Sequence, residues 1–456
     1  MRKLLTLLFL FSYLSSLTAQ DISGKWLGLL KIQGMELDLY FNISKKENNY
    51  TATMDVPKQG AKGIPVTAVE LKDSTLNISV GALGISYVGI IQNDSLVKGE
   101  FNQRGTLLPL DLKRVDDAAG ELVRPQTPKP PFPYLEEEIV FKNTKDNISL
   151  SGTLSLPKDK TNFPTVVLIS GSGPQNRNSE IFGHQSFWVI ADYLTRQGIG
   201  VLRYDDRGTA ESEGDFSTAT SFDFAEDVRA AVSYLKSRKD ISPNKIGLMG
   251  HSEGGMIAPI VASEANTVNF IVLLAGPGLP GKELMLLQKA TIEKAGQVPP
   301  PIINQGQEVM GGAYNRVINA TPDDQTLKDS LTAYFRDSYD NLIPEDQLHS
   351  LVQQISSPWM MNFIKHDPAP ILQKVTVPVL ALNGEKDLQV PPQENLAAIE
   401  AALKKGGNTD FTTKEFPNLN HLFQNCETGL VNEYGNIEET FSEEVLSEIT
   451  KWINMR

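Results

Sequence analysis

Ser252 lies in the segment Gly250-His251-Ser252-Glu253-Gly254, between an apolar run at 245–249 and a helix-compatible stretch. A Gly-x-Ser-x-Gly pattern in that setting predicts a sharp strand-to-helix turn, in which side chains at the two glycine positions would collide with the chain. The turn holds the serine hydroxyl at the carboxyl end of the strand, and the backbone N–H of Glu253 points to the same place. The segment therefore predicts a nucleophile and half of an oxyanion hole. Because five-residue patterns also arise by chance, the presence of catalytic partners decides whether Ser252 is read as a nucleophile.

A serine hydroxyl attacks a carbonyl only if an imidazole takes its proton and a carboxylate orients that imidazole. Asp387 follows the apolar run 378–382 in a Gly-containing loop, where an acid can face the carboxyl ends of parallel strands. Glu385 in the same loop is the alternative, but it lies closer to the strand, and we favour Asp387. His421, in the loop after a candidate last strand, is the expected base. The predicted order along the chain is Ser252, Asp387, His421.

The second oxyanion donor should come from a loop after an earlier strand. Ser170-Gly171-Ser172-Gly173-Pro174-Gln175 has this position, and its small residues allow backbone N–H groups to approach a tetrahedral oxygen. The N–H of Ser172 or of a neighbour is therefore the expected partner of the Glu253 N–H. Together these groups would perform acyl transfer through an acyl-enzyme that water hydrolyses, without a metal or organic cofactor.

The elements that must position these groups lie in residues 136–456, where apolar runs alternate with amphipathic stretches. This alternation is typical of a mostly parallel sheet with helices on both faces. The expected strands are 165–170, 200–204, 245–249, 270–275, 378–382 and 411–416, and expected helices include 188–194 and 222–239. Residues 277–374 lack the strand pattern, which predicts a helical cap inserted between two strands. Its methionines either line an adaptable acyl site or fill the cap core: Met285, Met310, Met360 and Met361.

Residues 21–115 show short alternating runs separated by Gly, Asn and Asp turns, which predict a small all-β domain, a barrel or a sandwich. Side chains fill most small barrels, and a ligand pocket is the less common alternative. Residues 116–135 contain five prolines between Val123 and Pro133 and predict a proline-rich linker. A hairpin should open the second domain, which runs from residue 136 to 456.

Residues 1–20 combine two basic residues, an apolar run and a small-residue zone, and so predict a signal peptide. An uncleaved anchor is the alternative, but the apolar run is short for about 30 Å of hydrocarbon. We expect an exported protein, periplasmic or secreted, with no membrane span after cleavage. The formal charge of −13 argues against nucleic acid or anionic membrane as a partner and leaves a small-molecule ester as the expected one. Cys426 is the only cysteine, so intramolecular disulfides are impossible.

From about residue 136 to its end the chain resembles α/β-hydrolases with a Ser-Asp-His triad, above all exported bacterial esterases and serine-aminopeptidase-like hydrolases. The resemblance rests on four motifs: Ser170 to Gln175, Arg203-Tyr204-Asp205-Asp206-Arg207-Gly208, Gly250 to Gly255, and Asn383-Gly384 ahead of Asp387. It implies that Asp205 to Gly208 shape a loop and that Arg207 is structural. Thr209-Ala210-Glu211 departs from the smaller, Gly-containing turn of the relatives, which leaves the local substrate-side loop open.

The expected activity is that of an exported serine carboxylesterase acting on short or medium acyl esters. A peptidase or amidase of the serine aminopeptidase type is the enzymatic alternative, because the same triad cleaves amides. The non-enzymatic alternative is a surface binding protein in which residues 21–115 bind glycan or lipid and the hydrolase fold is catalytically inert.

Overall fold

The computed structural model describes residues 21–32, 35–47, 49–57, 61–103, 105–117, 123–158, 160–321 and 326–456. The predicted signal peptide, residues 1–20, lies outside these residues. The chain divides into two compact units, Met1–Glu121 and Leu122–Arg456. Within the described ranges, none of the helices combines the length and the apolar character that a membrane crossing requires.

The first unit is an antiparallel β-barrel. Its strands are β1 (Gly24–Ile32), β2 (Met35–Lys46), β3 (Asn49–Val56), β4 (Ala61–Pro65), β5 (Ala68–Lys72), β6 (Thr75–Val80), β7 (Ile85–Asn93), β8 (Leu96–Gln103), β9 (Thr106–Pro109) and β10 (Leu112–Val115). Neighbouring strands pair from β1 through β2, β3, β5, β6 and β7 to β8, and β10 closes the ring by pairing with both β8 and β1. Of the two predicted all-β forms, the structure is thus the barrel.

Side chains fill the interior of this barrel. Trp26, Phe41, Tyr87 and Phe101 are each at most 2% exposed and belong to one apolar cluster. A methyl group at Gly99 would overlap both the Tyr87 hydroxyl and the Val88 carbonyl, so a glycine here is what makes room for the aromatic ring. The core of the first unit is therefore a packed one, the more common of the two states expected for a small barrel.

The second unit is built on an eight-stranded sheet within the described residues, in the order β11-β12-β16-β13-β17-β18-β19-β20. The strands are β11 (Leu135–Asn143), β12 (Ile148–Leu156), β13 (Thr165–Ile169), β16 (Gly200–Tyr204), β17 (Ile246–His251), β18 (Phe270–Leu274), β19 (Val379–Gly384) and β20 (Phe411–Phe416). Strand β12 is antiparallel to both of its neighbours, β11 and β16. The strands from β16 to β20 in this order run parallel to one another. The predicted mostly parallel sheet is confirmed.

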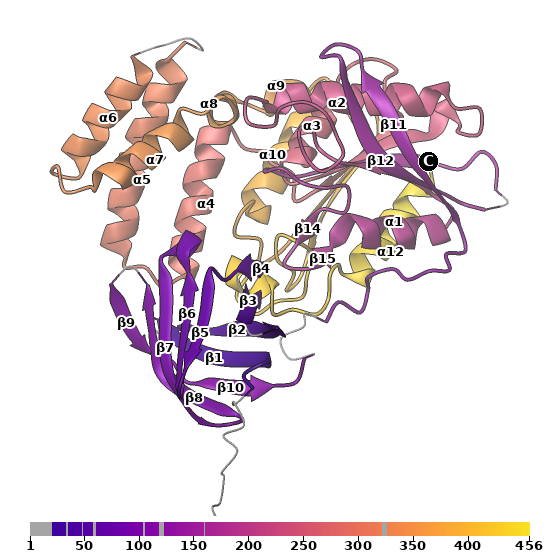
Figure 1. Cartoon of the computed structure of the whole chain (residues 1–456). Helices are drawn as coiled ribbons and strands as arrows, with labels where there is room; N and C mark the ends of the chain where they lie inside the picture. The colour runs from indigo at the N-terminus through magenta and orange to yellow at the C-terminus, as the bar shows by residue number, and fades with distance from the viewer. Residues whose placement is uncertain are drawn as a thin grey trace, which may run out of the picture. The chain divides into compact units, whose positions relative to one another are not determined.

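Helices cover both faces of this sheet (Figure 1). Helices α1 (Ser186–Arg196) and α12 (Glu443–Ile453) pack on one face, and α2 (Ser221–Ser237), α3 (Glu253–Ala262) and α10 (Pro392–Lys405) pack on the other. Successive residues of a strand point to opposite faces, so a strand covered on both faces, such as β13, is apolar from Val166 to Ile169. Val166 faces the α1 layer and Val167 faces the α2 layer, and both are fully buried.

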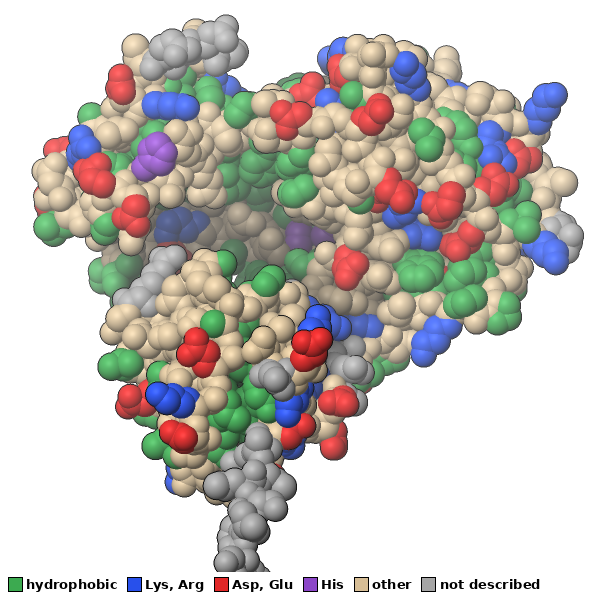
Figure 2. Space-filling model, viewed as in Figure 1, with side chains coloured by type: hydrophobic (Ala, Val, Ile, Leu, Met, Phe, Trp, Pro, Cys, Tyr) green, Lys and Arg blue, Asp and Glu red, His purple; other side chains and the backbone are tan. Residues whose placement is uncertain are grey.

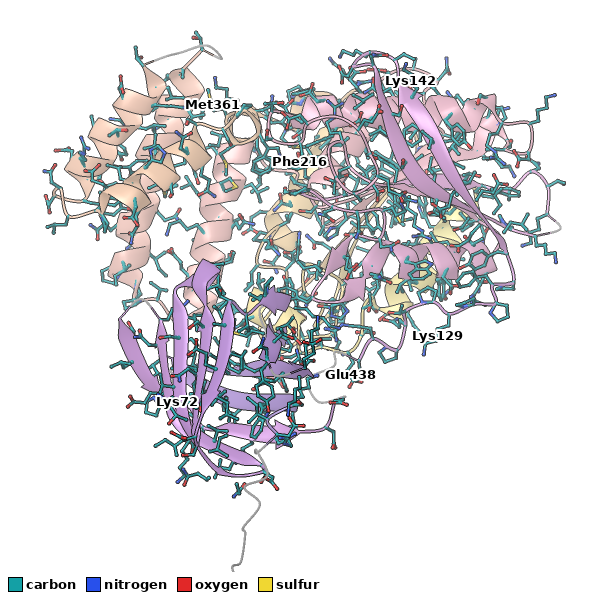
Figure 3. All side chains as sticks on the ribbon, in the orientation of Figure 1. Lys72, Lys129, Lys142, Phe216, Met361 and Glu438 are labelled. Atoms are coloured by element: carbon teal, nitrogen blue, oxygen red, sulfur yellow. The ribbon has the colours of Figure 1, made fainter. Side chains whose placement is uncertain are left out.

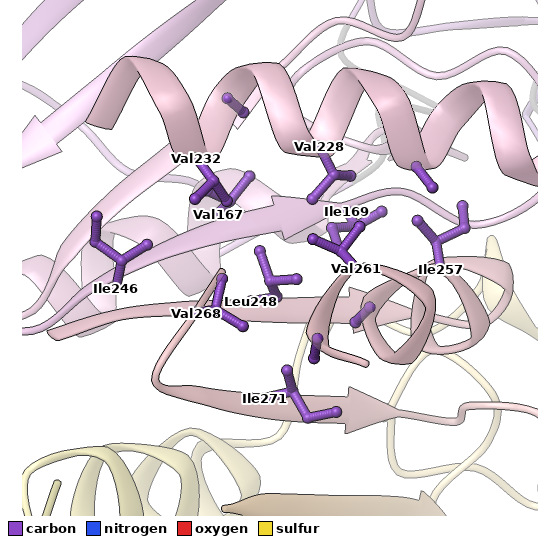
Figure 4. Packing of buried hydrophobic residues seen from close by; sticks show 14 of the residues in the cluster. Val167, Ile169, Val228, Val232, Ile246, Leu248, Ile257, Val261, Val268 and Ile271 are labelled. Carbon is purple, nitrogen blue, oxygen red and sulfur yellow. The ribbon is translucent and has the colours of Figure 1, made fainter. Parts of the chain in front are cut away.

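Figure 4 shows the packing on the α2 and α3 side, where Val232 of α2 lies over Val167, and Val228 of α2 and Val261 of α3 lie near Ile169. Burying each such side chain contributes about 1.5–3 kcal/mol to folding. This apolar layer holds α3 rigidly against β17, and the turn between these two elements carries Ser252.

The cap consists of helices inserted between β18 and β19: α4 (Gly281–Ala295), α5 (Pro300–Asn319), α6 (Leu327–Ser338), α7 (Glu345–Ile355), α8 (Pro358–Lys365) and α9 (Ala369–Leu372). They include the salmon and orange helices of Figure 1. The cap has its own apolar cluster, around Val317, Leu331 and Phe335. Met360 belongs to this cluster, and Met285, Met310 and Met361 pack against it; Figure 3 labels Met361 on the ribbon of α8. These methionines therefore contribute to the cap core.

Part of the proline-rich segment is bound to the larger unit. The Arg124 guanidinium donates to the backbone carbonyls of Phe182, Gly435 and Ile437 at 2.8 to 3.0 Å. The Tyr134 hydroxyl donates to the Asp192 carboxylate on α1 at 2.8 Å. These contacts account for the second compact unit beginning near residue 122, ahead of β11.

Candidate active site

Ser252 sits at a strained turn between β17 and α3. Its backbone has φ 54° and ψ −119°, a conformation that costs a non-glycine residue about 1–3 kcal/mol and persists only where the surroundings enforce it. Here the Ser252 N–H donates to the Leu274 carbonyl at 2.8 Å. A methyl group at Gly250 would overlap the Gly254 carbonyl, and one at Gly254 would overlap the Ile169 carbonyl. The strand, sharp turn and helix predicted from the sequence are all present.

Asp387 and His421 form a buried pair. Asp387 Oδ2 lies 2.8 Å from His421 Nδ1, and the two residues are 2% and 4% exposed. The other Asp387 oxygen accepts the N–H groups of Gln389 and Val390 at 2.8 and 2.9 Å, which fixes the orientation of the carboxylate. An imidazole that donates from Nδ1 keeps Nε2 free to accept a proton.

Glu385, the alternative acid, is placed differently. Its side chain is exposed and accepts the backbone N–H of Asn418 at 2.8 Å. It therefore stabilises the loop that leads to His421 without contacting the imidazole. Between the two acids left open by the sequence, the structure brings Asp387 to the histidine.

His251 joins the turn at Ser252 to the His421 loop. Its Nε2 lies 2.9 Å from the His421 backbone oxygen, and the two ring centroids are 4.8 Å apart. Desolvation, together with the neighbouring His421, lowers the pKa of His251 to about 3, so the ring is neutral and donates from Nε2. Among the described residues no hydrogen bond joins the Ser252 hydroxyl to His421, as is common before a substrate is bound.

The loop from Ser170 to Gln175 lies against Ser252. A methyl group at Gly171 would lie 3.1 Å from Ser252 Cβ, so the backbone of the loop passes directly beside the turn. In the described part of the chain, neither the Ser172 N–H nor the Glu253 N–H has an acceptor. Both remain available to bind a developing negative charge.

Asp206 holds this loop at both ends, a role that the sequence did not reveal. One carboxylate oxygen accepts the Ser170 hydroxyl at 2.5 Å, and the other accepts the Gln175 N–H at 2.9 Å. Burial raises the pKa of Asp206 to about 7. The only signal in the sequence was its place in the motif from Arg203 to Gly208, which was assigned to loop shaping in general.

The rest of that motif is structural. Arg207 pairs with the carboxylates of Asp227 and Asp146 at 2.7 and 2.8 Å. Arg177 pairs with Asp205 and also with Glu211, each at 2.6 Å. The segment at Glu211, where the chain departs from its relatives, is therefore anchored by an ion pair.

An apolar cluster connects the turn at Ser252 to the cap. Met256 of α3 packs with Leu284 of α4, Phe363 of α8 and Val390 of the Asp387 loop, and all four are at most 5% exposed. Figure 2 shows that the surface of the larger unit is hollowed between the cap helices and the rest of the unit, with hydrophobic side chains along the hollow. These four side chains form an apolar wall between α3, the cap helices and the Asp387 loop.

Comparison with known proteins gives a family match and several relatives. The family model described as serine aminopeptidase, S33, matches residues 184–427. Esterase EstD of Thermotoga maritima is 28% identical over 309 residues, which cover 67% of this chain and 65% of the esterase. An uncharacterised protein of Salmonella typhimurium, YfhR, is 27% identical over 129 residues, 27% of this chain and 40% of its own length. This chain thus spans less than two thirds of the length of either relative.

Among solved structures, an esterase of Pyrococcus furiosus is similar with a TM-score of 0.45 at 17% identity, over 74% of this chain and 98% of the esterase. A dienelactone hydrolase of Anabaena variabilis is similar with a TM-score of 0.40 at 16% identity, over 71% of this chain and 98% of its own.

Proposed function

Because the chain belongs to the serine aminopeptidase S33 family of α/β-hydrolases, whose model matches more than half of its residues, we propose that it cleaves short or medium acyl esters through an acyl-enzyme on Ser252. One observation carries the proposal: the buried Asp387–His421 pair contacts His251, the residue next to a serine held at positive φ at the end of a central strand. Fold alone does not assign chemistry, but a nucleophile, a base and an orienting acid in one place do.

In the proposed mechanism, His421 Nε2 takes the proton of the Ser252 hydroxyl while the oxygen attacks the ester carbonyl. The backbone N–H groups of Glu253 and of Ser172 or its neighbour Gly171 stabilise the oxyanion. The tetrahedral intermediate collapses, the alcohol leaves with the proton from His421, and an acyl ester on Ser252 remains. His421 then takes a proton from water, the resulting hydroxide attacks the acyl group, and the acid is released as the proton returns to Ser252.

Two features favour an ester with an apolar acyl group over an aminoacyl substrate. The wall of Met256, Leu284 and Phe363 beside the turn is apolar, which suits a hydrocarbon chain. The buried carboxylates nearest the site, Asp206 and Glu253, already accept hydrogen bonds from the protein, so neither is free to bind a substrate ammonium group. The predicted signal peptide, residues 1–20, supports the further proposal that the enzyme works in the periplasm or outside the cell.

The test uses purified residues 21–456 with p-nitrophenyl esters from acetate to dodecanoate, aminoacyl p-nitroanilides, and a fluorophosphonate probe, with Ser252→Ala as control. Ester turnover and labelling that both disappear in the control would support the proposal. Faster turnover of the anilides than of the esters would favour the peptidase alternative. A folded wild-type protein that the probe does not label would refute the serine mechanism.

A further inference from the structure

Glu253, the residue that follows Ser252, has a buried carboxylate. The residue is 2% exposed, and its Oε1 accepts the Ser221 hydroxyl at 2.6 Å and the Trp359 indole N–H at 2.8 Å. The Ser172 side chain lies near the same carboxylate and stabilises its charged form. Burial raises the pKa of Glu253, and these three side chains act in the opposite direction by stabilising the charged form. The mechanism proposed above uses only the backbone N–H of this residue.

The three side chains come from separate parts of the larger unit. Ser172 belongs to the loop proposed to supply an oxyanion donor, Ser221 begins α2, and Trp359 lies on cap helix α8. A buried carboxylate is costly unless its hydrogen bonds are made. The position of each side chain is therefore coupled to the position of the other two through this one group.

Trp359 also contacts the apolar wall. Its ring stacks on Phe363, with centroids 5.3 Å apart and planes 24° from parallel, and it packs against the cluster that contains Met256. A hydrocarbon chain bound along this wall would thus meet the residue whose indole N–H reaches Glu253.

We propose that Glu253 is a positioning residue that couples cap helix α8 to the oxyanion hole, so that an acyl chain contacting the cap raises the rate of the chemical steps as well as the affinity. This inference rests on the proposed esterase function. The route is from the acyl chain to Trp359, from its indole N–H to the Glu253 carboxylate, and from there to the Glu253 backbone and the Ser172 loop.

The experiment measures kcat and KM of the wild type for p-nitrophenyl acetate and hexanoate, together with Trp359→Phe, Glu253→Gln and the double variant. The wild type should show a higher kcat for hexanoate than for acetate. Trp359→Phe should lower this kcat ratio about tenfold while the KM ratio changes little, because the apolar wall remains but the indole hydrogen bond to Glu253 is lost. Glu253→Gln should lower it less, since an amide oxygen still accepts but makes a weaker bond. The double variant should match Trp359→Phe.

Two control variants separate coupling from general damage. Trp188→Phe removes an indole N–H that has no acceptor within the described residues, and Glu264→Gln changes an acid at the far end of α3 that pairs with Arg229. Both should keep the wild-type kcat ratio. Thermal midpoints show which variants fold, and if Glu253→Gln does not, Trp359→Phe alone decides the question.

The inference is overturned if the wild-type kcat ratio shows no preference for hexanoate, or if folded Trp359→Phe keeps the wild-type ratio. Additive losses in the double variant would also overturn it, because they would place the two residues on independent paths. Failure of the underlying function looks different: the fluorophosphonate probe would then leave the wild type itself unlabelled.

Discussion

Asp387→Asn tests the assignment of the acid most directly. An asparagine can keep one oxygen toward the N–H groups of Gln389 and Val390, which now bind Asp387 Oδ1. Its amide nitrogen would then face His421 Nδ1 at the present 2.8 Å. Because that nitrogen only donates, the imidazole must accept at Nδ1 and carry its proton on Nε2. Nε2 could then no longer take the proton of Ser252.

The expected loss in kcat is about 10³- to 10⁴-fold, as when the acid of a Ser-His-Asp triad is neutralised without changing its shape. At 1.36 kcal/mol per factor of ten, this is about 4–5.5 kcal/mol of transition-state stabilisation. Water cannot take the place of the lost carboxylate, because Asp387 and His421 are 2% and 4% exposed. The thermal midpoint should stay within a few degrees of the wild type, since the variant preserves the volume and the backbone hydrogen bonds.

Stopped-flow or steady-state hydrolysis of p-nitrophenyl butyrate measures the effect, with Ser252→Ala setting the floor. Glu385→Gln is the matched control, because it makes the same chemical change two positions earlier, on an exposed side chain that accepts the Asn418 N–H. It should retain nearly full activity. The opposite result, an inactive Glu385→Gln with Asp387→Asn near wild type, would show that the His421–Asp387 geometry does not reflect the working site.

Two further predictions concern the frame of the site. Burial raises the pKa of Asp206 from 3.8 to about 7, so its ionisation opposes folding and the wild type loses stability as pH rises from about 4 to about 7. Asp206→Asn should remove up to about 4 kcal/mol of this loss, which the free energies of unfolding in urea at pH 4, 6 and 8 would show. If the free energy of unfolding changed with pH equally in the variant and the wild type, the prediction would be wrong. Gly254→Ala should abolish fluorophosphonate labelling and lower the thermal midpoint, because the methyl group would overlap the Ile169 carbonyl. Gly311→Ala on α5 is the control, because its new methyl group would lie 3.9 Å from Leu286 without overlap. It should keep both the labelling and the thermal midpoint of the wild type.

The sequence predicted the α/β sheet well because the central strands are buried on both faces and therefore contain apolar runs, as in residues 166–169 of β13 and in β18. The turn at Ser252 could also be predicted, since its Gly-x-Ser-x-Gly pattern is local and Gly250 is required by contact with Gly254; Gly254 itself is required by the distant carbonyls of Ile169 and Ser170. The neighbouring sequence does not determine whether Asp387 or Glu385 is the acid. It depends on which of two side chains in one loop reaches a second loop 34 residues further along.

The barrel was harder to predict in detail. Strand β8 mixes Lys98, Gly99 and Glu100 with its apolar residues, so its alternation is weak, although its pairing with β7 and β10 is essential for closing the ring. The run 107–112 reads as one strand but belongs to two, β9 and β10, with a break at Leu110 and Asp111. The side chains of Asp206 and Glu253 were missed for a similar reason, because their hydrogen-bond partners lie more than 30 residues away.

The anchoring of Arg124 determines where a hydrolase fragment can be cut for expression. A fragment that begins at residue 136, just after the start of β11, would lack the guanidinium and leave the three carbonyl groups that it binds without their donor. These bonds are part-buried, and a fully buried acceptor left without a donor costs about 1–3 kcal/mol, so losing all three should lower the stability of the fragment. A fragment that begins at residue 123 keeps these bonds and the Tyr134 contact with α1. The usable start of the catalytic unit therefore lies inside the proline-rich segment, about one dozen residues ahead of the first strand of its sheet.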